Sequence, residues 1–163
     1  MKLEKELGLK TGIKNAPHEA LLNIYHTGDI LKKRARQFFA RYGITDVQFN
    51  LMELLYYQAD GEKGLTQAEL GRMLVVNRSN VTSLLDRMEK ADLVKRAHVP
   101  GDRRFNAVCL TPRGREVLEG VEERYMKEVE KVMGALTGSE MDGLIRSLER
   151  IRGGLNRRGE EDK

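Results

Sequence analysis

The sequence has very few residues that could form cross-links or bind a metal ion. Its 163 residues include one cysteine, Cys109, and three scattered histidines, His18, His26 and His98. A disulfide needs two cysteines, and a structural zinc ion is usually held by four cysteine or histidine ligands. The sequence therefore excludes an internal disulfide and a zinc tetrad, and it predicts no metal and no cofactor. So little cysteine is typical of a protein of the reducing cytoplasm.

Long apolar segments are also missing. No run of Ala, Val, Ile, Leu, Met, Phe, Tyr or Cys exceeds four residues, whereas a transmembrane helix needs about 20. Residues 1–14 have no apolar core of the kind that a signal peptide contains. We therefore expect a soluble, cytoplasmic protein with no membrane partner.

Signatures of catalysis are absent as well. The sequence has no Walker loop, no G-x-G-x-x-G, no H-E-x-x-H and no G-x-S-x-G, which mark nucleotide-binding and hydrolase sites. A chain of 163 residues corresponds to one domain, and the helices predicted below leave no room for a catalytic domain. We therefore expect that the protein is not an enzyme.

Hydrophobic spacing and helix caps predict the order of the first elements. Apolar residues at intervals of three, four and seven predict a long amphipathic helix, and capping boxes beginning at Thr45 and Thr66 predict two more helix starts. The predicted helices cover about residues 17–41, 45–57, 66–74 and 78–91. Two short helices joined by a three-residue turn, as in the last pair, are typical of a helix-turn-helix.

A strand pattern follows. Residues 93–98 and 105–110 are rich in strand formers, and Pro100 and Gly101 suit the two central positions of a type II turn. The sequence therefore predicts a β-hairpin directly after the helix-turn-helix.

Two long amphipathic helices end the sequence. Thr111 and Pro112 suit the start of one, and a third capping box, at Thr137, begins the other. The predicted fold is mainly α: a winged helix-turn-helix in residues 45–111, flanked by dimerisation helices with flexible ends in residues 1–44 and 112–163. Apolar stripes on the flanking helices need a partner surface, which a second chain can supply. Packing within one chain is the alternative.

The helix predicted at residues 78–91 has a polar outward face. Its apolar residues share one side, and the outward or flanking side chains that could read DNA are Ser79, Asn80, Thr82, Ser83 and Arg87. Short polar side chains near the N-terminus of such a helix can approach base edges in the major groove. The alternative is that Asn77 or Ser79 only caps the helix.

The tip of the predicted hairpin is basic. Asp102, Arg103 and Arg104 follow the Pro-Gly turn, and narrow minor grooves accept inserted arginine because they concentrate negative potential. An incidentally charged, solvated tip is the alternative. Residues 78–104 contain seven basic and four acidic side chains, although the whole chain is nearly balanced at 29 to 25. This local excess favours a DNA-binding wing.

The same residues resemble a known family. The matching runs are Leu65-Thr66-Gln67-Ala68-Glu69-Leu70, Arg78-Ser79-Asn80-Val81-Thr82, Leu85-Asp86-Arg87-Met88-Glu89-Lys90 and Asp102-x-Arg104-x-x-x-Val108-x-Leu110-Thr111-x-x-Gly114. They are similar to the MarR family of winged helix-turn-helix transcriptional regulators, and the resemblance extends over about residues 17–155. It implies a homodimer with interlocked terminal helices, major-groove reading by residues 78–91, and minor-groove insertion of Arg104, which Asp102 orients. One departure is Asp92, where the family usually has glycine.

The resemblance also implies a small aromatic or phenolic effector between the DNA-binding region and the dimerisation helices. Candidate lining residues are Tyr25, His26, Met52 and Tyr56. The alternative is plain core packing, which is common for methionine and aromatic side chains at helical spacing. The reactive cysteine and the histidine cluster of the family's redox and metal-sensing branches have no counterpart here.

The sequence thus predicts a cytoplasmic, homodimeric, sequence-specific DNA-binding transcriptional regulator. The expected activity is that of a ligand-responsive repressor on a pseudo-palindromic double-stranded operator. The alternative is a winged-helix protein-interaction module that does not bind DNA. The Asp102 and Arg104 tip and the polar face of helix 78–91 favour DNA binding.

Overall fold

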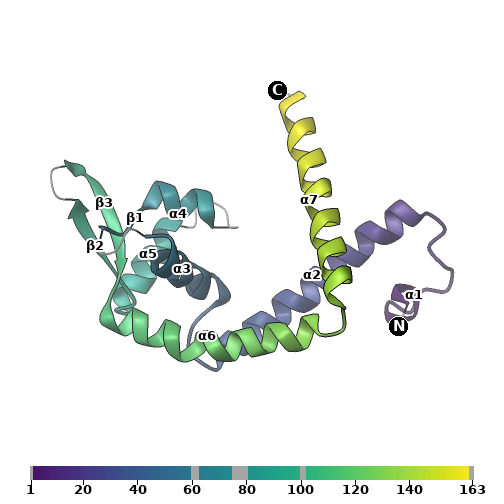
Figure 1. The fold of residues 1–163 in the computed structure, drawn as a ribbon, viewed down its shortest axis with the longest axis horizontal. Coiled ribbons are helices and arrows are strands. Elements are labelled where there is room, and N and C mark those ends of the chain that lie inside the picture. Colours follow the sequence, from purple (N-terminus) through teal and green to yellow (C-terminus); the bar gives the residue numbers. More distant parts are fainter. Residues whose placement is uncertain (1, 60–62, 75–80, 100–101, 162–163) are drawn as a thin grey trace. The chain divides into compact units, whose positions relative to one another are not determined.

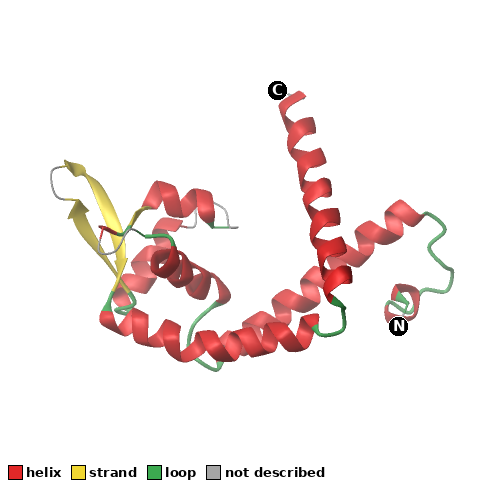
Figure 2. Cartoon of the chain, viewed as in Figure 1, coloured by secondary structure: helices red, strands yellow, loops and turns green. Residues whose placement is uncertain are grey.

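The computed structural model describes residues 2–59, 63–74, 81–99 and 102–161; within these ranges the side chains of residues 98–99, 102–106 and 156–161 are outside the described set. The elements in chain order are α1 (Leu3–Glu6), α2 (Ala16–Ala40), α3 (Asp46–Tyr57), β1 (Leu65–Thr66), α4 (Gln67–Met73), α5 (Val81–Lys90), β2 (Val94–Val99), β3 (Asp102–Leu110), α6 (Pro112–Met133) and α7 (Gly138–Glu161) (Figure 1). This mainly helical chain with one small sheet (Figure 2) confirms the predicted fold class.

Local caps explain where the helices begin. At the start of α3, the Thr45 hydroxyl accepts the Gln48 N–H at 3.2 Å, and the Gln48 side chain accepts the Thr45 N–H at 2.8 Å. The same reciprocal pairs join Thr66 with Glu69 at α4 and Thr137 with Glu140 at α7. Each pair satisfies backbone N–H groups that a helix start leaves without partners. All three predicted capping boxes are confirmed.

The sheet is antiparallel, with the strand order β1-β3-β2. Strands β2 and β3 form the predicted hairpin, in which Val94 pairs with Leu110. Strand β1 adds a short third strand on the other side of β3, where Leu65 pairs with Val108. The sequence pattern did not predict β1, because two residues are too few to show strand periodicity.

The hydrophobic core lies where α2, α3, α5 and the sheet bring their apolar faces together. The rings of Phe39 on α2 and Phe49 on α3 lie 4.7 Å apart between centroids, and both are almost fully buried. The apolar face of α5 is buried as predicted, and its residues are Val81, Leu84, Leu85 and Met88. Because this face is used for packing, only the opposite face of α5 is open to solvent.

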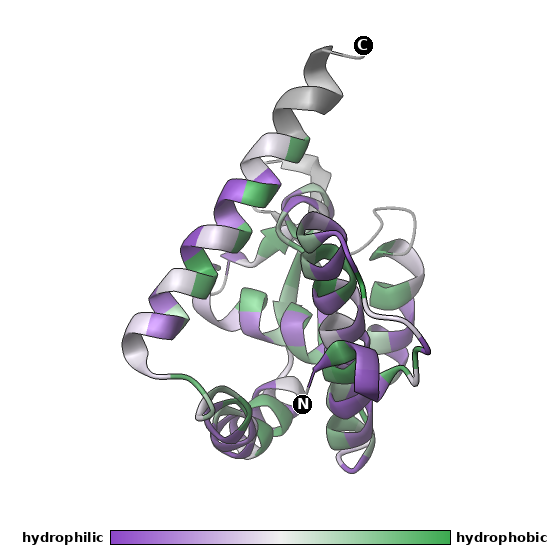
Figure 3. Cartoon of the chain, turned by 90° about the vertical axis from the view of Figure 1, so that its right-hand side faces the viewer, coloured by the Kyte–Doolittle hydropathy of each residue, from purple (hydrophilic) through white to green (hydrophobic). Residues whose placement is uncertain are grey.

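The chain divides into two compact units, Met1–Leu118 and Glu119–Lys163, with the boundary inside α6. Taken by itself, the second unit carries hydrophobic residues along α7 that recur among hydrophilic ones (Figure 3). Several are exposed, and Leu155 is the most exposed at 64%. The division at residues 44/45 and 111/112 into dimerisation and DNA-binding regions stays a prediction.

The N-terminal segment contains a short helix that the sequence pattern did not predict. Leu3 of α1 is buried, and the Glu4 carboxylate accepts the backbone N–H of Ile13 at 2.8 Å. The Glu4 bond joins α1 to the loop that follows it. In the part of the chain that the structure describes, none of the helices combines the length and the apolar character that a membrane span requires.

Candidate nucleic-acid interface

Helix α5 exposes polar side chains opposite its buried face. Thr82, Ser83 and Arg87 are all exposed. The Thr82 hydroxyl accepts a hydrogen bond from the side-chain amide of Gln67 on α4, so the first helix of the motif positions a residue of the second. The Arg87 Nε donates to the Ser83 carbonyl at 3.2 Å, which holds the Arg87 side chain back along the helix toward its N-terminus.

The other predicted DNA-binding residues are described only in part. Ser79 and Asn80 lie outside the described residues. Asp102, Arg103 and Arg104 are the first three residues of β3, and their side chains are outside the described set. The backbone pairs Asp102 with Val99, so these residues directly follow the tip of the hairpin.

An ion-pair cluster that the sequence analysis did not identify joins the hairpin to α5. The Arg96 guanidinium of β2 lies 2.6 Å from the Asp86 carboxylate and 2.5 Å from the Glu89 carboxylate. These contacts raise the pKa of Arg96, and the hydrogen bond to Asp86 is the largest cause. Two acids three residues apart on a helix, followed by an arginine on the next strand, are the signal that could have indicated this cluster.

The backbone turns left-handed two residues after the end of α5. Asp92 has a φ of 55°. The Leu93 N–H donates to the Met88 carbonyl at 2.9 Å, and the Asp92 N–H donates to the Glu89 carbonyl at 3.0 Å. This pair of bonds is a Schellman motif, in which glycine is the usual left-handed residue. Asp92 thus adopts the left-handed conformation that glycine usually adopts at this position of the motif.

The start of α6 lies directly against this turn. A Cβ atom at Gly114 would lie 2.0 Å from the Leu93 carbonyl oxygen, which is closer than any side chain permits. This contact gives a physical reason for the glycine of the Leu110-Thr111-x-x-Gly114 run.

The four candidate effector residues lie in unlike environments. Met52 is fully buried and forms part of the core, whereas Tyr25 is 62% exposed. His26 Nε2 lies 3.4 Å from a Glu6 carboxylate oxygen of α1. The fourth candidate, Tyr56, is covered by the Arg115 guanidinium of α6, whose central carbon lies 5.1 Å from the ring centroid. The structure therefore pairs Tyr56 with an arginine that the sequence analysis did not single out.

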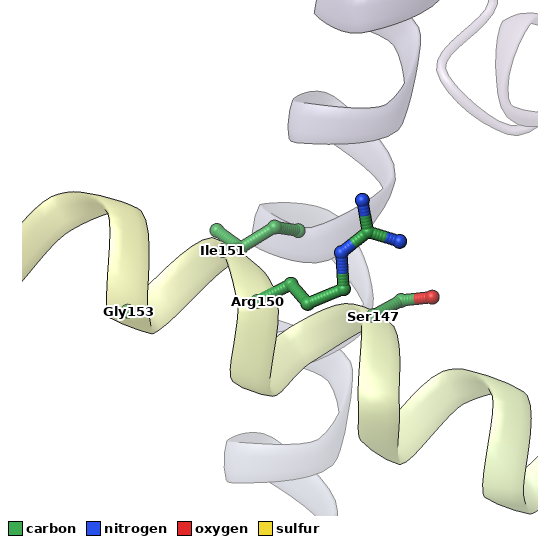
Figure 4. Close-up of a pocket in the computed structure, with 4 residues that line it drawn as sticks. All are labelled: Ser147, Arg150, Ile151 and Gly153. Carbon is green, nitrogen blue, oxygen red and sulfur yellow. The ribbon is translucent and has the colours of Figure 1, made fainter.

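A hollow of about 550 Å³ lies along α7, and its lining residues are Ser147, Arg150, Ile151 and Gly153 (Figure 4). None of the four is a predicted site residue. The described lining residues combine one charged side chain with apolar and small ones, and they belong to α7.

The geometry defines a class of protein. A helix-turn-helix whose second helix buries one face and exposes a polar one, followed by a β-hairpin, is a winged helix-turn-helix. Residues 42–104 match the sequence model of the MarR family. The uncharacterized HTH-type transcriptional regulator YsmB of Bacillus subtilis is 28% identical over 136 residues, which are 83% of this chain and 90% of YsmB. Over its helix-turn-helix and wing, the chain is therefore similar to the MarR family of transcriptional regulators.

Solved structures show the same fold. AbsC, a MarR family transcriptional regulator from Streptomyces coelicolor, superposes with a TM-score of 0.80 at 19% identity, over 90% of this chain and 99% of AbsC. MepR of S. aureus, in a complex with DNA, superposes with a TM-score of 0.71 at 23% identity, over 81% of this chain and 94% of MepR.

Proposed function

We propose that this protein is a cytoplasmic transcriptional regulator that binds DNA sequence-specifically as a homodimer and represses transcription until an effector binds. The observation that carries the proposal is the division of α5 into a buried apolar face and an exposed polar face. A recognition helix needs this arrangement, because one face must fix it to the protein while the other enters the major groove. The MepR structure, which has the same fold and contains DNA, supports the proposal.

Each candidate residue has a proposed role in the complex. The base-reading residues are Ser79, Asn80, Thr82, Ser83 and Arg87. On the wing, Arg104 enters the minor groove, Asp102 orients the Arg104 guanidinium, and Arg103 approaches a phosphate. We assign this DNA-binding region to residues 45–111.

We assign dimerisation to residues 1–44 and 112–163. Helices α2 and α7 each expose large apolar side chains, which are Leu21, Ile24, Tyr25, Ile30 and Leu31 on α2, and Leu144, Ile145, Ile151 and Leu155 on α7. Covering such side chains with a second chain stabilises a dimer by about 25 cal/mol for each Å² of apolar surface removed from water. Two-fold symmetry then sets two recognition helices about one turn of DNA apart, so the operator is a pseudo-palindrome.

The proposed effector is a small aromatic or phenolic molecule. Tyr56 and Arg115 support this choice, because an aromatic ring and a guanidinium side by side can accept a ligand ring and its oxygen. Tyr25, His26 and Met52 remain proposed lining residues. A ligand between α3 and α6 would act on elements that flank the DNA-binding region.

Selection of bound duplexes from a random DNA pool tests the proposal. A shared motif with inverted symmetry is expected, together with a particle of about 37 kDa by light scattering, twice the 18.6 kDa of one chain. A pool that stays random after selection would favour the alternative of a protein-interaction module without DNA binding. A monomer at micromolar concentration would overturn the dimer.

A further inference from the structure

Three polar contacts of Arg96 with described residues connect the wing to the recognition helix. Its Nη2 atom lies 2.6 Å from Asp86 Oδ1, and its Nη1 atom lies 2.5 Å from Glu89 Oε2. Its backbone N–H donates to the other Glu89 oxygen, Oε1, at 3.1 Å. Both acids belong to α5, and Arg96 lies in the middle of β2.

The backbone contact shows why β2 needs such a partner. The strand order β1-β3-β2 makes β2 an edge strand of the described sheet. On an edge strand, every second N–H group points away from the sheet and needs a partner other than a strand. Glu89 accepts one of these N–H groups, from Arg96. Helix α5 therefore supplies, through Glu89, a hydrogen-bond acceptor of the kind that a neighbouring strand would supply.

The charges of the cluster also matter for a protein that approaches DNA. Asp86 and Glu89 are exposed on α5, the helix proposed to enter the major groove, where an unneutralised carboxylate repels phosphate. Arg96 neutralises part of this charge because its guanidinium is bound to both carboxylates. Its side chain is only 26% exposed, and each terminal nitrogen is bound to a carboxylate. It is therefore poorly placed to serve as a phosphate contact itself.

We propose that Arg96 is a positioning residue that fixes the wing to the recognition helix, so that both reach the operator in one set geometry. The inference rests on the proposed DNA binding of α5 and the wing. Arg96 acts on DNA through Asp86 and Glu89, and the two grooves are read by a single rigid unit. Removing either side of the cluster therefore weakens binding to the operator.

The decisive variant removes an acid rather than the arginine. Glu89→Gln deletes a negative charge near the DNA, so electrostatics alone predicts tighter binding. If the positioning contact matters, its loss should instead weaken operator binding by about fivefold relative to wild type. This factor corresponds to the free energy of a partly exposed ion pair. Arg96→Gln should weaken binding to a similar degree, and Asp86→Asn provides a second acidic variant if Glu89→Gln unfolds. Lys95→Gln is the matched control, because it removes one positive charge from the neighbouring residue on the opposite face of β2.

The experiment measures affinity of the full-length dimer for the selected operator and for an unrelated duplex at several salt concentrations. Weaker operator binding by both Glu89→Gln and Arg96→Gln, with Lys95→Gln nearly unchanged, supports the inference. Tighter binding by Glu89→Gln, together with a salt slope that Arg96→Gln reduces by about one, would show that Arg96 contacts a phosphate and would overturn it.

A measurement without DNA separates this inference from the proposed function. Amide hydrogen exchange of residue 96 should be faster in Glu89→Ala than in wild type, and unchanged in Lys95→Gln, because Glu89 accepts that N–H and alanine has no acceptor to replace it. Unchanged exchange in Glu89→Ala contradicts the positioning contact. If wild type binds no duplex at all, the proposed function fails, while the exchange result still decides whether Glu89 holds the wing.

Discussion

The side-chain hydroxyl of Thr111 donates a hydrogen bond to the backbone carbonyl of Asp92 at 2.5 Å. The same oxygen accepts the Gly114 N–H at 2.9 Å, so one buried side chain caps α6 and holds Asp92, two residues beyond the end of α5. The Thr111 N–H adds a bond of 3.2 Å to the Leu93 carbonyl. The end of the recognition helix is therefore fastened to the start of the helix that leads to the second unit.

Thr111→Val should lower the free energy of unfolding by about 1–3 kcal/mol, because it leaves a partly buried carbonyl and an N–H without their partner. Urea unfolding measures the change. Thr111→Ser keeps the hydroxyl and should lose much less. Equal stability of the valine and serine variants would show that the two hydrogen bonds do not stabilise the junction.

Asp92→Gly should raise the free energy of unfolding by about 1 kcal/mol, because glycine adopts a φ of 55° without the steric cost that a side chain carries. Asp92→Ala is the control, since it keeps a Cβ and loses the polar side chain that tolerates this conformation. We expect the melting temperatures to rank glycine, wild type, alanine from highest to lowest. A glycine variant less stable than wild type would mean that the Asp92 carboxylate makes a stabilising contact.

Glu69 makes the stability of α4 depend on pH. Hydrogen bonds from the Thr66 N–H and hydroxyl lower the pKa of Glu69. A carboxylate whose pKa is lower in the folded state contributes stability that is fully present above its ordinary pKa of about 4.3, and that is lost as pH falls through the lowered value. Wild type should therefore be more stable than Glu69→Gln at pH 7, and the gap should narrow at pH 3. Thermal unfolding at both pH values checks this; a constant gap would contradict it.

The wing residues should differ in how they affect DNA binding. If Arg104 enters the minor groove as proposed, Arg104→Ala removes that cation, so affinity should fall and the preference for A·T-rich flanks should weaken. Arg103→Ala should lower affinity evenly across sequences and reduce the salt slope, as loss of a phosphate contact does. Asp102→Ala should resemble a milder Arg104→Ala. Titrations with one operator and a flank-altered version at two salt concentrations distinguish these outcomes, and wild-type behaviour of Arg104→Ala would exclude minor-groove reading by the wing.

Local interactions were the predictable part of this fold. The capping boxes at Thr45, Thr66 and Thr137 join residues three apart, so their pattern is visible in the sequence, and the apolar face of α5 follows from helical periodicity. Strand β1 and the Arg96 cluster depend on contacts between separate elements. No local pattern shows that Leu65 lies beside Val108. The effector candidates also depend on such contacts, because only the fold shows that Met52 is core and that Arg115 lies over Tyr56.

The most direct test of the central claim is the base preference of Ser83→Ala compared with wild type, measured by selection from the same random DNA pool. Ser139→Ala, an exposed serine at the start of α7, is the matched control. If the outward face of α5 reads bases, Ser83→Ala should change the preferred bases within each half-site, because it removes a hydroxyl that can bond a base edge, while its melting temperature and the control's motif match wild type. An identical motif and affinity for wild type and Ser83→Ala would contradict base reading by this face.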